Sequence, residues 1–154
     1  MGIFVALALA ALPAPVTLHG VGGVKPGMTP TQVSKAWGVP VVLGAASPGS
    51  TCQVAQISRG AVRGYAIFER KRFGAVFFRA GETTDTGIHH GSPLAALRAA
   101  YGARLKLYPD KYTPKAKTAF VGGAWKLRFD ISRQGKVTVI AFGARPVSYV
   151  EGCS

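Results

Sequence analysis

The sequence is poor in acidic residues, in cysteine and in recognisable catalytic motifs. Only six of its 154 residues are Asp or Glu, and no two of them stand out as the paired carboxylates of a general acid/base mechanism. Its two cysteines, without paired histidines, do not complete a zinc shell. Nucleophile-elbow and phosphate-loop motifs are also missing. The sequence therefore predicts a protein that is not an enzyme and that needs no metal or cofactor.

The charge that is present is strongly one-sided. Nineteen Lys and Arg residues against six acids give a formal net charge of +13 at pH 7. Such an excess determines which partners a surface attracts rather than which fold the chain adopts. Acidic proteins, acidic wall polymers, anionic lipid and nucleic acid all fit a basic surface, so the cellular compartment decides among them.

An uncharged apolar run near the N-terminus indicates the compartment. Residues 3–12 form this run, which is too short to span a bilayer but has the length of a signal-peptide core. The alternative is a buried first strand or helix. We expect residues 1–10 to be a signal peptide cleaved near Ala10 and residues 11–22 to be an N-terminal extension. The mature protein would then be secreted or held in the cell envelope, which disfavours nucleic acid as a partner.

The two cysteines, Cys52 and Cys153, are expected to form a disulfide. An exported protein meets an oxidising compartment, and closing a loop of about 100 residues stabilises the folded state by about 4.7 kcal/mol in the chain-entropy model. The alternative is a nucleophilic thiol, for which no Asp or Asn is evident to orient a histidine.

Two segments of the sequence align without gaps at a spacing of 64 residues. Residues 23–38 (GVKPGMTPTQVSKAWG) and 87–102 (GIHHGSPLAALRAAYG) share glycines at both ends and at one inner position. This self-similarity predicts two tandem units, residues 23–86 and 87–154. The expected frame of the first unit consists of Gly23, Gly27, Thr29 and Gly38, and that of the second consists of Gly87, Gly91, Ser92 and Gly102.

Each of these segments predicts a short helix. In the first, Thr29 caps a helix that opens at Pro30, with a Thr-x-x-Gln capping box, and Gly38 ends it. In the second, we expect Ser92 to cap the helix and Pro93 to open it, one residue out of the alignment. Neither helix exceeds about three turns, so each must pack its apolar side on something larger.

That support is predicted to be an antiparallel sheet, because the sequence after each helix alternates and is rich in β-branched and aromatic residues. The expected strands are Cys52–Ser58, Tyr65–Glu69, Gly74–Arg79, Ala119–Val121, Ala124–Ser132 and Lys136–Phe142. Residues 44–51 and 108–117 are the expected long loops. The strand at 124–132 has one apolar face and one polar face that carries Lys126 and Arg128. The predicted fold class is α+β, with two tandem helix-plus-strand repeats forming one curved sheet and the short helices packed on one face.

Residues 24–40 (VKPGMTPTQVSKAWGVP) carry a more specific pattern. It resembles the hydrophobic-x-x-Gly-Met-Thr signature shared by β-lactamase inhibitor proteins and small outer-membrane assembly lipoproteins. The tandem copies resemble the inhibitor family more closely, which implies a concave, aromatic-bearing sheet that grips another protein. That family closes a disulfide inside each repeat, whereas Cys52 and Cys153 would join the two units. The resemblance therefore extends to the fold more than to the target.

The candidate partner-binding residues are basic and aromatic side chains of two hairpins, a composition typical of protein interfaces. The alternative is that they are solvated charges that protect strand edges. The candidates are Arg70, Lys71, Arg72, Phe73, Lys126, Arg128 and Lys136. We expect an exported, non-enzymatic protein-binding module, which could act as an enzyme inhibitor, that grips a partner through its sheet face. The alternative is a basic envelope protein held electrostatically to acidic wall polymers or anionic lipid.

Overall fold

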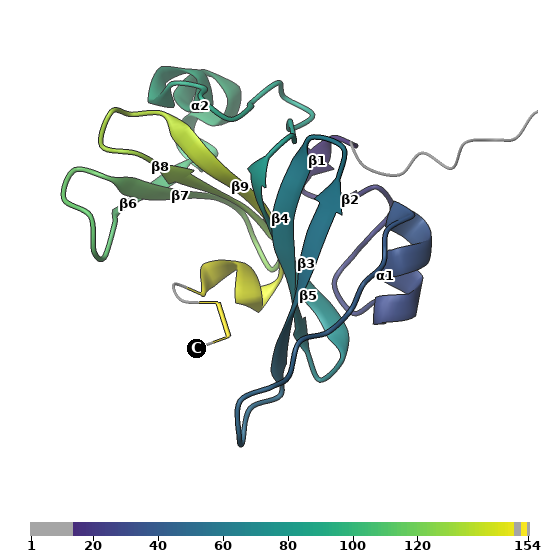
Figure 1. Cartoon of the computed structure of the whole chain (residues 1–154). Helices are drawn as coiled ribbons and strands as arrows, with labels where there is room; N and C mark the ends of the chain where they lie inside the picture. Colours follow the sequence, from purple (N-terminus) through teal and green to yellow (C-terminus); the bar gives the residue numbers. More distant parts are fainter. Residues whose placement is uncertain (1–13, 150–151, 154) are drawn as a thin grey trace, which may run out of the picture.

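The computed structural model describes residues 14–149 and 152–153, so the expected signal peptide at residues 1–10 lies outside the described residues. The chain forms a small two-stranded sheet, a seven-stranded sheet and a few short helices (Figure 1). In chain order the elements are β1 (Val16–Thr17), β2 (Gly20–Val21), α1 (Pro30–Trp37), β3 (Cys52–Arg59), β4 (Val62–Glu69), β5 (Arg72–Ala80), α2 (Leu94–Tyr101), η1 (Gly102–Arg104), β6 (Lys106–Pro109), β7 (Lys117–Gly122), β8 (Lys126–Ile131), β9 (Val137–Gly143) and η2 (Arg145–Ser148). Among the described residues, no helix is long and apolar enough to cross a membrane.

The large sheet has the strand order β3-β4-β5-β9-β8-β7-β6, and every neighbouring pair is antiparallel. At its centre β5 pairs with β9, with Phe77 opposite Ala141. The strands on the two sides of this pair run in clearly different directions in Figure 1, so the sheet twists across its middle. The expected α+β class with short helices and an antiparallel sheet is confirmed.

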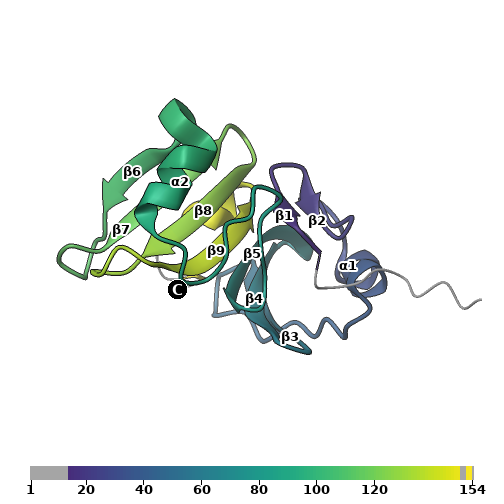
Figure 2. The same ribbon diagram turned by 90° about the horizontal axis from the view of Figure 1, so that it is seen from above.

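Both helices pack on the same face of this sheet, over its two halves (Figure 2). Val33 and Trp37 of α1, and Leu97 and Tyr101 of α2, are buried in one continuous hydrophobic core with the inward side chains of the strands. Each helix has only eight residues. Because helices this short are marginal on their own, this packing is what holds them in place.

Several strand boundaries differ from the sequence-based expectation. β4 and β5 both begin earlier, at Val62 and Arg72. The turns before them, residues 60–61 and 70–71, are only two residues long, so pairing starts immediately after each turn. β6 lies partly inside the expected loop 108–117, and β1 and β2 lie inside the expected extension. All three are strands of two to four residues, too short for alternation to be recognised.

The start of α1 agrees with the prediction. The backbone N–H of Gln32 donates to the side-chain oxygen of Thr29 at 3.3 Å, and the amide oxygen of Gln32 accepts from the backbone N–H of Thr29 at 2.9 Å. This reciprocal capping box satisfies two helix-terminal donors. Gly38 follows the helix in the left-handed region with φ 63°, a conformation that glycine adopts without steric cost.

The start of α2 corrects the prediction. Pro93 occupies the N-cap position and makes no side-chain cap bond, and the helix opens at Leu94 rather than at Pro93. The side chain of Ser92 is committed elsewhere, because it accepts the backbone N–H of His89 at 3.0 Å. The N–H of Leu94 donates instead to the carbonyl of Gly135 in the β8–β9 turn at 2.9 Å. Contacts with a neighbouring hairpin therefore replace the side-chain cap.

Candidate functional site

The face of the large sheet that points away from the helices carries the candidate site, and we call it the open face. Strand pairing aligns one side chain from each strand in a single row across this face. Since the row follows from backbone pairing, its side chains stand on rigid strands rather than on loops. In sheet order the row is Gln56, Tyr65, Phe77, Ala141, Arg128, Phe120 and Lys106.

The end of the chain covers one part of the open face. Residues 144–149 and 152–153, which we call the strap, contain η2 and pack through Val147 on Ile67, Ala75 and Phe77. A disulfide between Cys52 of β3 and Cys153 fastens the end of the strap, with 5.4 Å between the two Cα atoms. The expected Cys52–Cys153 disulfide is therefore confirmed. Such a bond is typical of proteins that fold in an oxidising compartment.

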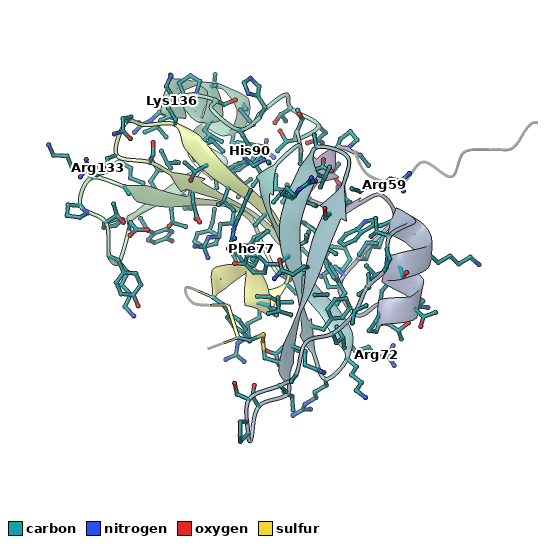
Figure 3. All side chains as sticks on the ribbon, viewed as in Figure 1. Arg59, Arg72, Phe77, His90, Arg133 and Lys136 are labelled. Atoms are coloured by element: carbon teal, nitrogen blue, oxygen red, sulfur yellow. A yellow bond between two sulfur atoms is a disulfide. The ribbon has the colours of Figure 1, made fainter. Side chains whose placement is uncertain are left out.

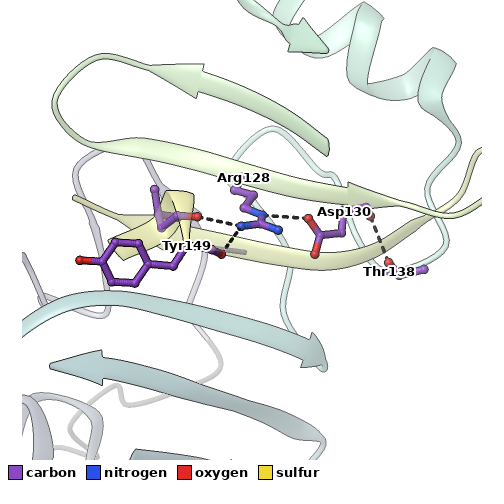
Figure 4. A network of polar contacts seen from close by, with 5 residues as sticks. Arg128, Asp130, Thr138 and Tyr149 are labelled. Carbon is purple, nitrogen blue, oxygen red and sulfur yellow. Dashed lines mark hydrogen bonds and ion pairs between the residues drawn. The ribbon is translucent and has the colours of Figure 1, made fainter. Parts of the chain in front are cut away.

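Arg128 fastens the middle of the strap (Figure 4). Its guanidinium donates to the carbonyl oxygens of Val147 at 3.1 Å and Tyr149 at 2.8 Å, and its Nε donates to Oδ1 of Asp130 at 2.8 Å. The side chain is only 8% exposed. The expectation that Arg128 is available on a wet face is wrong. Alternation placed it on the correct face of β8, but a local pattern does not show that a distant segment covers that face.

Beside Arg128 the open face has a small pocket of about 120 Å³. Its floor is the stacked ring pair of Tyr65 and Phe77, whose centroids lie 5.0 Å apart. At its mouth the exposed Arg79 guanidinium lies 5.1 Å from the centroid of Tyr65, and Asp130 completes the polar lining. Burial raises the pKa of Tyr65, so its phenol is a neutral donor. The pocket can thus hold a group that accepts from Arg79 and Tyr65 while donating to Asp130.

The sequence did not identify Arg79 as a site residue, although it ends an expected strand. It shares a pocket with Asp130 and Tyr149, which lie 51 and 70 positions later in the sequence. Strand order brings Asp130 near it, and the strap brings Tyr149. No local signal connects these positions. Among the residues that the structure describes, no group of three or more His, Cys, Asp or Glu side chains is placed to hold a metal ion.

The candidates at the tip of the β4–β5 hairpin divide into exposed and buried side chains. Arg70, Lys71 and Arg72 are exposed, and a guanidinium nitrogen of Arg72 donates to the carbonyl of Gly27 at 3.3 Å. Phe73 is only 2% exposed and packs edge-on against Trp37 in the core. Phe73 is therefore wrong as a surface anchor, because the strand alternation that exposes Arg72 turns the next side chain inward.

The two lysines proposed with them, Lys126 and Lys136, belong to the hairpin formed by β8 and β9. Lys126 is half-buried opposite Gly143, and Lys136 is exposed at the β8–β9 turn. Figure 3 shows Arg72 and Lys136 at opposite ends of the molecule. Lys136 therefore does not share a surface with the hairpin-tip residues Arg70, Lys71 and Arg72.

Comparisons with known proteins bear on the fold alone. No family model matches the chain, and no curated protein sequence matches it. A DUF4309 family protein from Bacillus subtilis superimposes with a TM-score of 0.54 at 14% identity, over 86% of this chain and 88% of that chain. A cysteine-rich secretory protein from Staphylococcus aureus gives 0.53 at 8% identity over 79% of this chain, which spans 45% of that protein. Such low identities indicate a shared architecture and not a shared function.

Proposed function

We propose that this protein is an exported, non-enzymatic module that binds an acidic partner protein through the uncovered part of its open face. One observation carries the proposal: this part of the sheet combines basic and aromatic side chains around a pocket. Tyr65 and Phe120 are half-buried, Tyr108 is 54% exposed, and Arg79 and Lys106 flank them. Aromatic and arginine side chains on rigid elements are the usual anchors of protein interfaces.

Charge supports an acidic partner. The chain carries +13 overall, and Arg79 has no carboxylate partner within the described part of the chain. A guanidinium that rests on an aromatic ring is partly desolvated and held in one position, so it loses little freedom when it binds a carboxylate. Inhibition of an enzyme is one form that such binding could take, in line with the resemblance of residues 24–40 to β-lactamase inhibitor proteins.

We further propose that the fold arose from two tandem copies, as in that family. Support comes from backbone bonds that recur 64 positions apart. The N–H of Gly27 donates to the carbonyl of Phe73, and the N–H of Gly91 donates to that of Val137, both at 2.8 Å. The helices α1 and α2 also begin and end 64 positions apart. Each half then contributes its last strand to the central β5–β9 pair.

The test is capture of partners from the secreted and envelope fractions of the native host on immobilised oxidised protein. Washing at about 0.05 M and then about 0.5 M salt straddles the range over which exposed charge pairs are screened. We expect one protein to survive the high-salt wash, and the double variant Tyr65→Ala, Arg79→Ala to lose it. Arg133→Ala is the matched control, since Arg133 is an exposed arginine at the β8–β9 turn, away from the pocket (Figure 3).

Two outcomes would refute the proposal. Equal capture by the double variant would show that the open face is not the binding surface. Recovery of acidic polymer or anionic lipid alone, lost at high salt, would support the second candidate, a basic protein held electrostatically to the cell envelope.

A further inference from the structure

A larger pocket, of about 480 Å³, lies between the tip of the β4–β5 hairpin and the strap. Three arginines from three different elements line it: Arg70 from the turn, Arg72 from the start of β5 and Arg145 from η2. All three are exposed, and none has an ion-pair partner among the described residues. The lining contains a single acidic side chain, Glu69, so positive charge exceeds negative charge around this pocket and an anion is attracted to it.

The backbone at the rim of this pocket is unusual. Arg70 and Lys71 both have positive φ, at 50° and 59°, and they form the two-residue turn between paired Glu69 and Arg72. Asn and Gly normally fill such a turn because they tolerate this conformation. Side chains forced into it cost of order 1–3 kcal/mol each, and such strain clusters at binding sites. The strain at this turn thus falls on one of the three arginines, Arg70, and on the residue directly before another, Arg72.

The same pocket contains an acceptor. Oε1 of Glu69 accepts from the hydroxyl of Tyr149 at 2.7 Å, and Oε2 accepts from the hydroxyl of Thr51 at 3.2 Å. Each carboxylate oxygen retains a lone pair for a further donor. A fully deprotonated anion without hydroxyl groups offers no donor to this carboxylate. A ligand that carries hydroxyl groups as well as an anionic group would satisfy Glu69 and the arginines together.

Another part of the lining is apolar. Pro26, Gly74 and Pro146 line it. Gly74 lets η2 approach the bare backbone of β5, since a Cβ there would come within 2.5 Å of Cγ of Pro146. A sugar ring has a C–H face that packs on such a surface, hydroxyls for an acceptor and, when acidic, a carboxylate or phosphate for arginines. We propose that this pocket binds one anionic sugar unit of an acidic polysaccharide.

The test uses glucuronic acid and glucose 6-phosphate as probes, titrated into oxidised full-length protein and followed by amide chemical shifts. We expect both sugars to shift the amides of Gly74 and Ala144, which line this pocket and not the open-face pocket, saturably, and glucose and inorganic phosphate to bind more weakly than glucose 6-phosphate. Arg72→Gln and Arg145→Gln should each weaken sugar binding about tenfold. Glu69→Gln should weaken the sugars and leave inorganic phosphate unaffected or tighter.

Arg133→Gln is the matched control and should bind like the original protein. Amide spectra of every variant report whether the fold is retained. Binding of inorganic phosphate or of an acidic peptide as tightly as glucose 6-phosphate would overturn the assignment to a sugar, and saturable shifts in none of the titrations would overturn the site itself. The open-face proposal is tested separately, because the Tyr65→Ala, Arg79→Ala variant should keep its sugar binding.

Discussion

The two halves of the molecule each place one eight-residue helix on the sheet, and they fix that helix by different contacts. Their helices have equal length and lie on the same face of one sheet. The first helix is capped by its own residues, Thr29 and Gln32. The second begins at Leu94 with a bond to Gly135 of the neighbouring hairpin. The difference shows that the same helix can be fixed by a local sequence motif or by tertiary contact, and only the first kind is visible in the sequence.

The aromatic residue at the end of each helix is also fixed differently in the two halves. The indole N–H of Trp37 donates to the carbonyl of Val21 at 2.8 Å, and the hydroxyl of Tyr101 lies 2.8 Å from Oγ1 of Thr86. Both rings are buried. In each half a buried aromatic side chain therefore ties the end of the helix to the segment that precedes it, with a backbone acceptor in one case and a side-chain hydroxyl in the other.

Breaking the covalent link between the halves should have the largest effect. Replacing both cysteines, Cys52→Ser and Cys153→Ser, should lower the free energy of unfolding by about 2–5 kcal/mol, because the open chain gains entropy on unfolding. Urea denaturation of the variant, and of the original protein with and without reductant, measures the loss. If reduction leaves the unfolding midpoint unchanged, the strap is held by Arg128 and its packing alone.

The second-largest expected effect comes from a buried acidic side chain, Glu82, that is present in only one half. Glu82 is 2% exposed and one of its oxygens lacks a partner among the described residues, whereas Pro146 stands 64 positions later in the second half. Burial raises the pKa of Glu82 to about 7. The folded state therefore holds this proton to higher pH than the unfolded chain does, so this contribution to stability falls as the pH rises from about 4.5 to about 7.

The substitution Glu82→Gln should remove this loss of stability with rising pH. Relative to the original protein, the variant should gain about 1–2 kcal/mol of stability at pH 8 and almost none at pH 4. Urea denaturation at pH 4, 6 and 8 gives the difference between the two proteins at each pH, in which the other acids cancel. A difference that does not change with pH would mean that Glu82 titrates normally.

Matched glycines test how closely the frames of the two halves agree. Gly27 and Gly91 have φ of 96° and 90°, and a Cβ at either would meet no atom within 4 Å. Alanine should therefore cost only backbone strain, about 1 kcal/mol at each position. Gly123→Ala is the control, because Gly123 has open space but no positive φ. Clearly unequal losses at the two positions, measured by thermal unfolding, would contradict the equivalence of the frames.

The smallest expected change in stability comes from substitutions at the N-caps of the two helices. Thr29→Ala removes a capping box and should cost about 0.5–1 kcal/mol. Pro93→Ala removes no cap bond, so its cost should be smaller. Denaturant titration of both variants makes the comparison. Equal losses would mean that the capping box contributes nothing beyond the tertiary packing of α1.

Local and periodic signals account for what the sequence predicted. The capping box at Thr29, the glycine that ends α1 and the alternation in six of the strands each depend on a few neighbouring residues, and the disulfide was predicted from two cysteines in a sequence that we expect to be exported. The pocket of the open face and the strap beside it could not be predicted, because both are built by contacts between residues far apart in the sequence. No local pattern shows that the strap lies over Arg128, or that Arg79 and Asp130 line one pocket, because these contacts depend on strand order and on residues far apart.

The position of the disulfide also sets an order of events during biosynthesis. Its two cysteines are separated by 101 positions, so Cys52 cannot form this bond until the whole second half has been synthesised. A chain truncated anywhere between the two cysteines has an odd thiol and an uncovered apolar strip along β4 and β5. In an oxidising compartment such chains join to one another through Cys52, so covalent dimers distinguish unfinished molecules from complete ones.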